Sequence, residues 1–219
     1  MISQDTCSEW PSAAEELCSK LAQGMHAAAQ PLTVLLASLS QGRTGRMNCD
    51  ELRELAASSA VQVQRACALF SSLQQLIMTE SMKPQLSPTP ILPLLAYATD
   101  GVNLLFQQDG MVLSSVAPSS CLPVLINRAL TLEALSRVLL VVHRLSSAQD
   151  VIEVIASSCA DAVAIVVRNL HLPVAALDAE ASLSIAVAEA NMRSQQGGLS
   201  VSLQPFTVRI ELPLARFAC

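Results

Sequence analysis

The segment Met25-His26-Ala27-Ala28-Ala29-Gln30-Pro31-Leu32-Thr33 places a histidine five residues before a proline, inside a long helical pattern. From Trp10 to Gly42, apolar or small residues recur in alternating steps of four and three, which predicts a helix that packs into a bundle. These residues are Ala14, Cys18, Leu21, Met25, Ala28, Leu32, Leu35 and Leu39. Pro31 removes one hydrogen bond and clashes with the Ala27 carbonyl, at roughly 3 kcal/mol. We expect a kinked helix with the imidazole of His26 exposed one turn before Pro31.

A second helix with the same repeat follows a short break. Gly42 to Arg46 interrupts the pattern, and Asn48 or Asp50 can cap the new helix. Its recurring positions are Leu52, Ala56, Ser59, Val63, Ala66, Phe70, Leu73 and Ile77. The two helices predict an antiparallel hairpin over residues 1–83. Because one hairpin cannot enclose a core, we expect a homodimer in which two copies form a four-helix bundle.

The rest of the chain has a mixed pattern that is typical of an α+β domain. Residues 84–90 form a proline-rich linker, and the second domain covers 91–219. Helices are expected at Ile91–Phe106, Thr131–Ser146 and Leu177–Met192. Strands are expected at Met111–Ala117, Asp150–Ser157, Asp161–Arg168, Leu199–Leu203 and Thr207–Leu212, with turns at Asp109-Gly110 and Gly197-Gly198.

Composition excludes several functional classes. The net charge of −5 argues against a nucleic-acid binder, which needs a basic surface. No apolar run approaches the roughly 20 residues that a membrane-spanning helix requires, and the start of the chain lacks the features of a secretory signal. We therefore expect a cytoplasmic protein with no nucleic-acid or membrane partner.

Cysteine and histidine patterns give no metal site. The seven cysteines form no Cys-x-x-Cys pair, so we expect reduced thiols that are mostly buried as small apolar residues. His143 is expected in or near the core of its helix, and His171 in a solvated loop. Without clustered carboxylates, the histidines lack metal-ligand spacing. Neither a metal nor a cofactor is expected.

The segment around His26 resembles the phospho-acceptor box of sensor histidine kinases. In that box, proline and leucine follow the histidine by five and six residues, and one common version has glutamine before the proline, where Gln30 stands. The resemblance implies that His26 is the phospho-acceptor, with Gln30 and Pro31 completing the site. The family usually has Asp or Glu directly after the histidine as a general base, but here that residue is Ala27.

The second domain resembles the ATP-binding domain of the same kinases, an α/β sandwich of the GHKL or Bergerat type, but without its nucleotide residues. The helix resembling the one with magnesium-binding asparagines reads Val141-Val142-His143-Arg144-Leu145. The segment Arg168-Asn169-Leu170-His171-Leu172-Pro173 stands where Asp-x-Gly-x-Gly is expected, and Ser182-Leu183-Ser184-Ile185 where a glycine-rich turn is expected. No glycine occurs between Met111 and Gln196, although backbones that cradle phosphates need glycine at points of close approach.

Three functions remain open. The first is two-component signalling, as a histidine phosphotransferase that passes a phosphoryl group through His26 to or from response-regulator receiver domains, without ATP. A sensor kinase is a further candidate partner. The partner is expected to contact the hairpin near His26 and near Arg53 or Arg65. The second is a pseudokinase scaffold that binds a kinase or regulator and transfers no phosphate. The third is a divergent ATP-dependent histidine kinase.

Overall fold

The chain divides into two compact units. A computed structural model describes residues 9–44, 48–117, 123–159, 161–171 and 174–215. The first unit comprises residues 1–75 and the second residues 76–219, so the division falls within the second long helix. The elements in chain order are α1 (Glu9–Thr44), α2 (Cys49–Ser81), β1 (Ser87–Thr89), α3 (Ile91–Gln108), β2 (Val112–Val116), β3 (Val124–Ile126), α4 (Arg128–Leu145), β4 (Val151–Ser158), β5 (Ala162–Asn169), α5 (Ala179–Arg193), β6 (Gly198–Leu203) and β7 (Phe206–Pro213).

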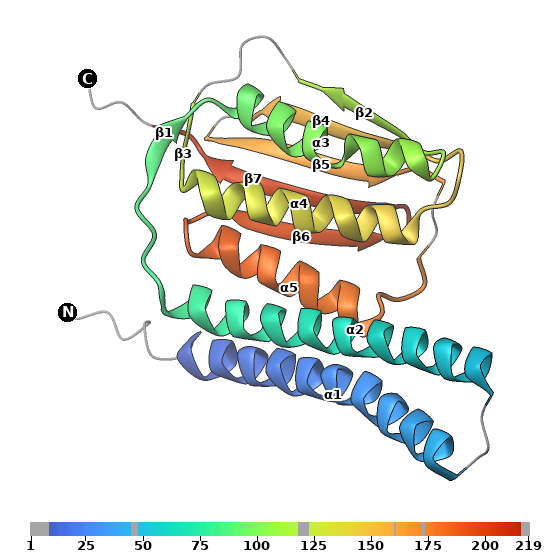
Figure 1. Cartoon of the computed structure of the whole chain (residues 1–219). Coiled ribbons are helices and arrows are strands. Elements are labelled where there is room, and N and C mark those ends of the chain that lie inside the picture. The colour runs from blue at the N-terminus through green and yellow to red at the C-terminus, as the bar shows by residue number, and fades with distance from the viewer. Residues whose placement is uncertain (1–8, 45–47, 118–122, 160, 172–173, 216–219) are drawn as a thin grey trace. The chain divides into compact units, whose positions relative to one another are not determined.

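The first unit is built from two long helices that run in opposite directions (Figure 1), as the hairpin prediction requires. Asn48 begins α2 with a capping box: its side-chain oxygen accepts hydrogen bonds from the backbone of Asp50 and Glu51, at 3.0 and 2.9 Å. The Glu51 carboxylate in turn accepts from the Asn48 amide at 2.8 Å. Of the two predicted caps, Asn48 therefore has this role. Helix α1 continues through Pro31 without a break.

The predicted single seam along each helix is divided between two faces. On α1, from Cys18 to Leu39, every second predicted seam residue is buried or half-buried, and the others are exposed. The buried or half-buried face of α1 contains Leu21, Gly24, Ala28, Pro31, Leu35, Ser38 and Gly42, and that of α2 contains Leu55, Ser59, Gln62, Ala66, Leu69 and Leu73. Gly24 and Ala28 lie on this inner face of α1. Their small size lets the two helices approach closely there, which bulkier side chains would prevent.

The exposed face of each helix carries its own heptad repeat, which we call the outer apolar stripe. Its members on α1 are Cys18, Ala22, Met25, Ala29, Leu32, Leu36 and Leu39. On α2 the repeat comprises Ala56, Ala60, Val63, Cys67 and Phe70. Both sets follow alternating steps of four and three, the spacing at which a helix packs against another helix. The hairpin thus has a second packing surface that no described residue covers.

The second unit is a sheet with helices on one side. The five strands lie in the order β2-β4-β5-β7-β6, in which β2 is parallel to β4 and every other neighbouring pair is antiparallel. Helices α3, α4 and α5 cover the same face of this sheet (Figure 1). Strands β1 and β3 form a separate antiparallel pair. The observed mixed α+β architecture confirms the predicted fold class.

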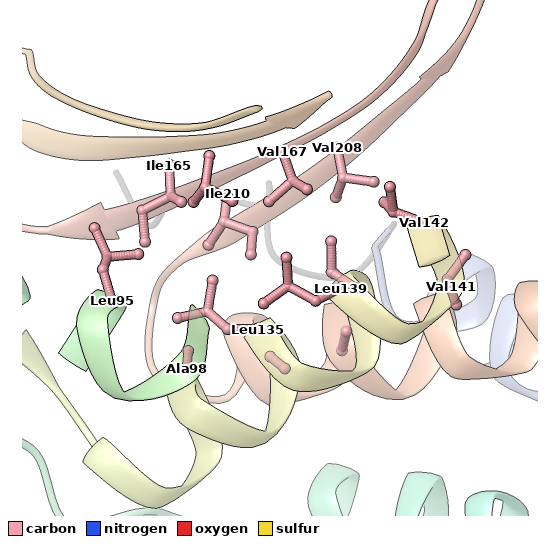
Figure 2. Close-up of a cluster of buried hydrophobic side chains, with 14 of the residues drawn as sticks. Leu95, Ala98, Leu135, Leu139, Val141, Val142, Ile165, Val167, Val208 and Ile210 are labelled. Atoms are coloured by element: carbon pink, nitrogen blue, oxygen red, sulfur yellow. The ribbon is translucent and has the colours of Figure 1, made fainter. Parts of the chain in front are cut away.

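A single hydrophobic core lies between the helices and the sheet. Figure 2 shows Leu135 and Leu139 of α4 pointing toward Ile165 and Val167 of β5, with Ile210 of β7 beside them. Alternate residues of β7 are fully buried, which gives the period of two expected of a strand with one covered face, and β5 follows the same alternation apart from the buried Ala164. This core fixes the ends of α4 and β5, where the candidate nucleotide residues would lie.

Two glycines are required by the backbone. Gly110 has a φ of +72°, a left-handed conformation that ends α3 and leads into β2. At Gly197, an added Cβ would lie 2.7 Å from the carbonyl oxygen of Glu211 in β7. The turn predicted from Asp109-Gly110 is confirmed, whereas the turn after α5 lies at residues 194–196 and Gly198 already begins β6.

Two sequence expectations need correction or extension. Cys18, Cys49, Cys67 and Cys159 are exposed, so the prediction of buried thiols is wrong for the four cysteines that the structure describes. Three of them lie on α1 and α2, and their side chains are on the exposed surfaces of these helices. Cys7, Cys121 and Cys219 lie outside the described residues. Strands β1 and β3 were not predicted, since three residues are too few to give a pattern.

Candidate functional site

His26 lies on the exposed side of α1, beside the outer apolar stripe. It belongs to a neighbouring row of exposed residues, the histidine row, which we define as Ser19, Gln23, His26, Gln30, Thr33, Ala37 and Ser40. A shallow hollow at this point is lined by His26, Ala29, Gln30, Thr33 and Val34. The imidazole is therefore open to a macromolecular partner, and Gln30 stands one helical turn from it on the same side.

The neighbouring positions explain why no carboxylate accompanies this histidine. Ala27, at the position where the phospho-acceptor box usually has an acid, is almost fully buried. Pro31 is also buried, whereas Gln30 is exposed. A charged side chain at position 27 would have to leave water without a counter-charge, which is strongly unfavourable. In this hairpin, the residue after His26 supports packing instead of acting on the imidazole.

Asn169, at the end of β5, is the central polar residue of the second unit. It is fully buried, on the helix-facing side of the sheet. Its amide nitrogen donates to the Ser146 hydroxyl at 2.9 Å and to the Asp150 carboxylate at 2.8 Å. Its oxygen accepts from the His171 backbone N–H at 3.0 Å. An asparagine amide has two hydrogens to donate, and both are used within the chain.

Asp150 holds this network from the other side. Its carboxylate accepts from the Ser147 backbone N–H at 2.9 Å as well as from Asn169. The hydrogen bond from Ser147, then that from Asn169, and more weakly the charge of His171, lower the pKa of Asp150 below its ordinary value of 3.8. The carboxylate thus stays ionised and bonded at neutral pH.

Arg144, in the last turn of α4, pairs with the first turn of α5. Its guanidinium contacts the carboxylates of Asp178 and Glu180, the latter at 2.8 Å. Asp178 is also the N-cap of α5 and accepts from the Ala181 N–H at 2.8 Å. The beginning of a helix favours an anion, and here two carboxylates of the chain itself supply the negative charge.

The connection between β5 and α5 is short. It comprises residues 170–178, nine in number, and contains no glycine. Ser182-Leu183-Ser184-Ile185, where the family resemblance implies a glycine-rich turn, lies inside α5. This placement agrees with the helix predicted over Leu177–Met192, and Asp178 caps the helix before these residues. This part of the chain therefore offers no glycine-rich backbone to surround a phosphate.

The two other histidines lie where expected. His143 is largely buried on α4, with its Nε2 2.9 Å from an Asp109 oxygen and its ring edge-on to Phe106, with centroids 4.9 Å apart. His171 is exposed. Within the described ranges, no cluster of three or more histidine, cysteine or acidic side chains is arranged to hold a metal ion. None of the described helices is long and apolar enough to cross a membrane.

Comparison with solved structures identifies the fold. The histidine kinase AdeS of Acinetobacter baumannii superimposes with a TM-score of 0.70 over 87% of this chain and 98% of its own, at 18% identity. The chain has the fold of a histidine kinase core. A histidine kinase from Burkholderia phymatum matches over 88% of this chain and 98% of its own, at 14% identity and a TM-score of 0.55. No protein-family model and no curated protein sequence matches the chain.

The chain also matches ShkA, whose full-length structure contains AMPPNP. The TM-score is 0.61 at 15% identity, over 94% of this chain and 47% of ShkA. The second unit thus has the mixed α+β fold that the sequence resemblance predicted for it. Sequence reasoning treated Asn169 only as part of a lost motif and did not identify its network. The alternation of β5 contains the missing signal, because Val163, Val167 and Asn169 lie on one face of the strand.

Proposed function

We propose that this histidine kinase core functions in two-component signalling as a phosphotransferase that carries a phosphoryl group on His26 and does not bind ATP. The observation that carries the proposal is a contrast between the two units. His26 is exposed on α1, whereas the polar groups at the ends of α4, β5 and α5 are bonded to one another. The acceptor is thus accessible, and the region that would bind a nucleotide is occupied by the chain itself.

The proposed reaction needs a single acceptor group from this chain. An unprotonated imidazole nitrogen of His26 attacks the phosphorus of a partner's aspartyl phosphate. The P–N bond forms while the P–O bond to the aspartyl carboxylate breaks, and the carboxylate leaves with the electron pair. The reverse step uses the same atoms. The receiver domain supplies the metal and the aspartate, so the missing acid beside His26 does not prevent transfer.

Gln30 is the second residue of the proposed site. It is exposed one turn after His26 and lines the same hollow, so its amide can donate to a phosphoryl oxygen. Hydrogen bonds to charged groups contribute about 1.5–3 kcal/mol. Pro31 has a structural part in the proposal, because it directly follows Gln30 and is buried on the inner face of α1.

A homodimer completes the proposed assembly. The outer apolar stripes of α1 and α2 expose large side chains, among them Met25, Leu36 and Phe70. Two hairpins would bury these stripes against each other as a four-helix bundle, while the histidine row stays at the edge of the interface. This arrangement leaves one His26 accessible in each protomer.

The absence of ATP binding is supported by three features of the second unit. Asn169 uses both of its amide hydrogens internally. Arg144 is engaged by Asp178 and Glu180, whose negative charges disfavour an incoming phosphate. The β5–α5 connection of nine residues lacks glycine. A nucleotide would have to break several satisfied contacts before forming its own.

The first test is a calorimetric titration of the full chain with Mg-AMPPNP, with ShkA as a positive control. We expect no heat of binding from this chain at ligand concentrations up to about 1 mM, and binding by ShkA. Micromolar affinity would contradict the ATP-independent proposal and favour a divergent kinase. Light scattering on the same sample should give the mass of a dimer.

The second test measures transfer. Purified receiver domains encoded by the same genome are phosphorylated with acetyl phosphate, and appearance of phosphohistidine is followed on the chain. We expect His26→Ala to abolish the signal and Gln30→Ala to slow it by about 10-fold or more, in line with one charged hydrogen bond. Unchanged host signalling in the His26→Ala strain would instead support the scaffold function.

A further inference from the structure

The middle of the hairpin is almost free of charge. Residues 21–42 of α1 contain no Asp, Glu, Lys or Arg, although the whole chain has 31 such residues, 13 basic and 18 acidic. Along residues 55–75 of α2, the only formal charge is that of Arg65, which is exposed. His26 lies well inside the uncharged part of α1.

The exposed residues around His26 are neutral but differ in polarity. The histidine row contributes amide and hydroxyl groups from Gln23, Gln30 and Thr33. The Thr33 hydroxyl donates back to the Ala29 carbonyl at 2.9 Å, so its hydrogen is already used. Val34 lines the same hollow as His26 and is 50% exposed. The hollow thus has an apolar wall at Ala29 and Val34.

Charge complementarity restricts what can dock here. Apart from the phosphoryl group that reacts with His26, a charged partner group buried against this surface would lose its hydration without gaining a counter-charge, at a cost of several kcal/mol. A neutral apolar group has no comparable desolvation cost, and its contact with Ala29 and Val34 buries apolar surface favourably. Electrostatic steering, which accelerates association between oppositely charged surfaces, has almost no source on this face.

We propose that the receiver domain that exchanges phosphate with His26 docks through an uncharged surface, and that an apolar side chain of the receiver packs against Val34, two helical turns from His26 in the same hollow, while the phosphoryl group reaches His26 and Gln30. This inference rests on the proposed phosphotransfer function and specifies the chemistry of its partner. Recognition then depends on shape and apolar contact, and salt has little effect on it.

The experiment uses the receiver domain that gives the fastest transfer in the panel described above. Initial rates of transfer to His26 are compared at 20 mM and 500 mM NaCl. We expect the two rates to agree within about 3-fold, because only screened charges respond to salt. A fall of 10-fold or more at high salt, with transfer otherwise intact, would overturn the uncharged docking surface and leave the proposed function in place.

Variants of Val34 test the hollow directly. Val34→Glu should slow transfer from the receiver by at least 10-fold, whereas Val34→Ile should retain the wild-type rate. The matched control is Val112→Glu in β2, because Val112 is 55% exposed and lies in the other unit. Phosphorylation of His26 by phosphoramidate should be the same in all variants, which shows that the imidazole itself is intact.

The two proposals fail differently. Equal rates for Val34→Glu and wild type would contradict the docking proposal alone. Absence of phosphohistidine with every receiver, together with normal labelling by phosphoramidate, would contradict both the phosphotransfer function and the docking proposal that depends on it.

Discussion

The two units of this chain differ in which polar and apolar groups they leave exposed. The hairpin leaves a histidine and two apolar stripes exposed. In the second unit, Asn169, Asp150 and Arg144 are bonded to partners within the chain. The comparison teaches that the exposure of a polar group, and not the fold around it, decides whether the group can react with another molecule.

Charging the outer apolar stripe should have the largest effect. Leu36→Glu combined with Phe70→Glu places four carboxylates in the interface of a dimer, and each unpaired buried charge costs several kcal/mol. We expect at least a 100-fold weaker dimer and a monomeric mass by light scattering at micromolar concentration.

Gln23→Glu is the control for that variant. Gln23 belongs to the histidine row and is exposed, so its charge should leave the dimer intact. If the double variant remains a dimer, the outer apolar stripe does not form the interface.

Asn169→Ala tests whether the second unit is self-contained. The substitution removes the donors to Ser146 and Asp150 and the acceptor for His171. Loss of partners for buried polar groups costs about 1–3 kcal/mol, and we expect a value near 3 because several groups are affected. Urea unfolding followed by circular dichroism gives the free energy, and a change below about 0.5 kcal/mol would show that the network is dispensable.

Two glycine-to-alanine substitutions compare a glycine that lies close to another backbone segment with a glycine that has free space around it. Gly197→Ala should destabilise the second unit by about 1–3 kcal/mol, because the new Cβ would lie 2.7 Å from the Glu211 oxygen. Gly101→Ala, in α3, meets no atom within 4 Å and should stabilise that helix by up to about 1 kcal/mol. The melting temperature should fall for Gly197→Ala and rise for Gly101→Ala. A rise for both variants would contradict the close approach at Gly197.

Acid should weaken the same network by a smaller amount. Because its folded pKa lies below 3.8, Asp150 contributes stability that is complete above that pH and decreases as the pH falls through the lowered pKa. Asp150→Asn should therefore reduce the loss of stability that occurs below about pH 3.8. Thermal unfolding between pH 2.5 and 6 measures it, and parallel curves for the two proteins would exclude the contribution.

Much of the fold follows from the sequence, since long periodic segments carry strong signals. The helices α3, α4 and α5 and all five strands of the main sheet were predicted close to their observed bounds. The division of each predicted helix seam between a buried face and an exposed face was not predicted. A heptad pattern marks the apolar positions but does not show which other helix covers each of them. The role of Asn169 depends on Asp150, 19 positions away, and on the β4–β5 register that brings them together. A single sequence does not state such pairings.

The bonds of Asn169 also restrict how this chain can change. An aspartate at position 169 would put a second carboxylate where an amide now lies 2.8 Å from Asp150. Two carboxylates at that distance cannot both be ionised, so one would have to take up a proton. An acidic residue at position 169 would avoid that proton uptake only if position 150 were changed as well. Asp150 thus limits which residues position 169 can hold.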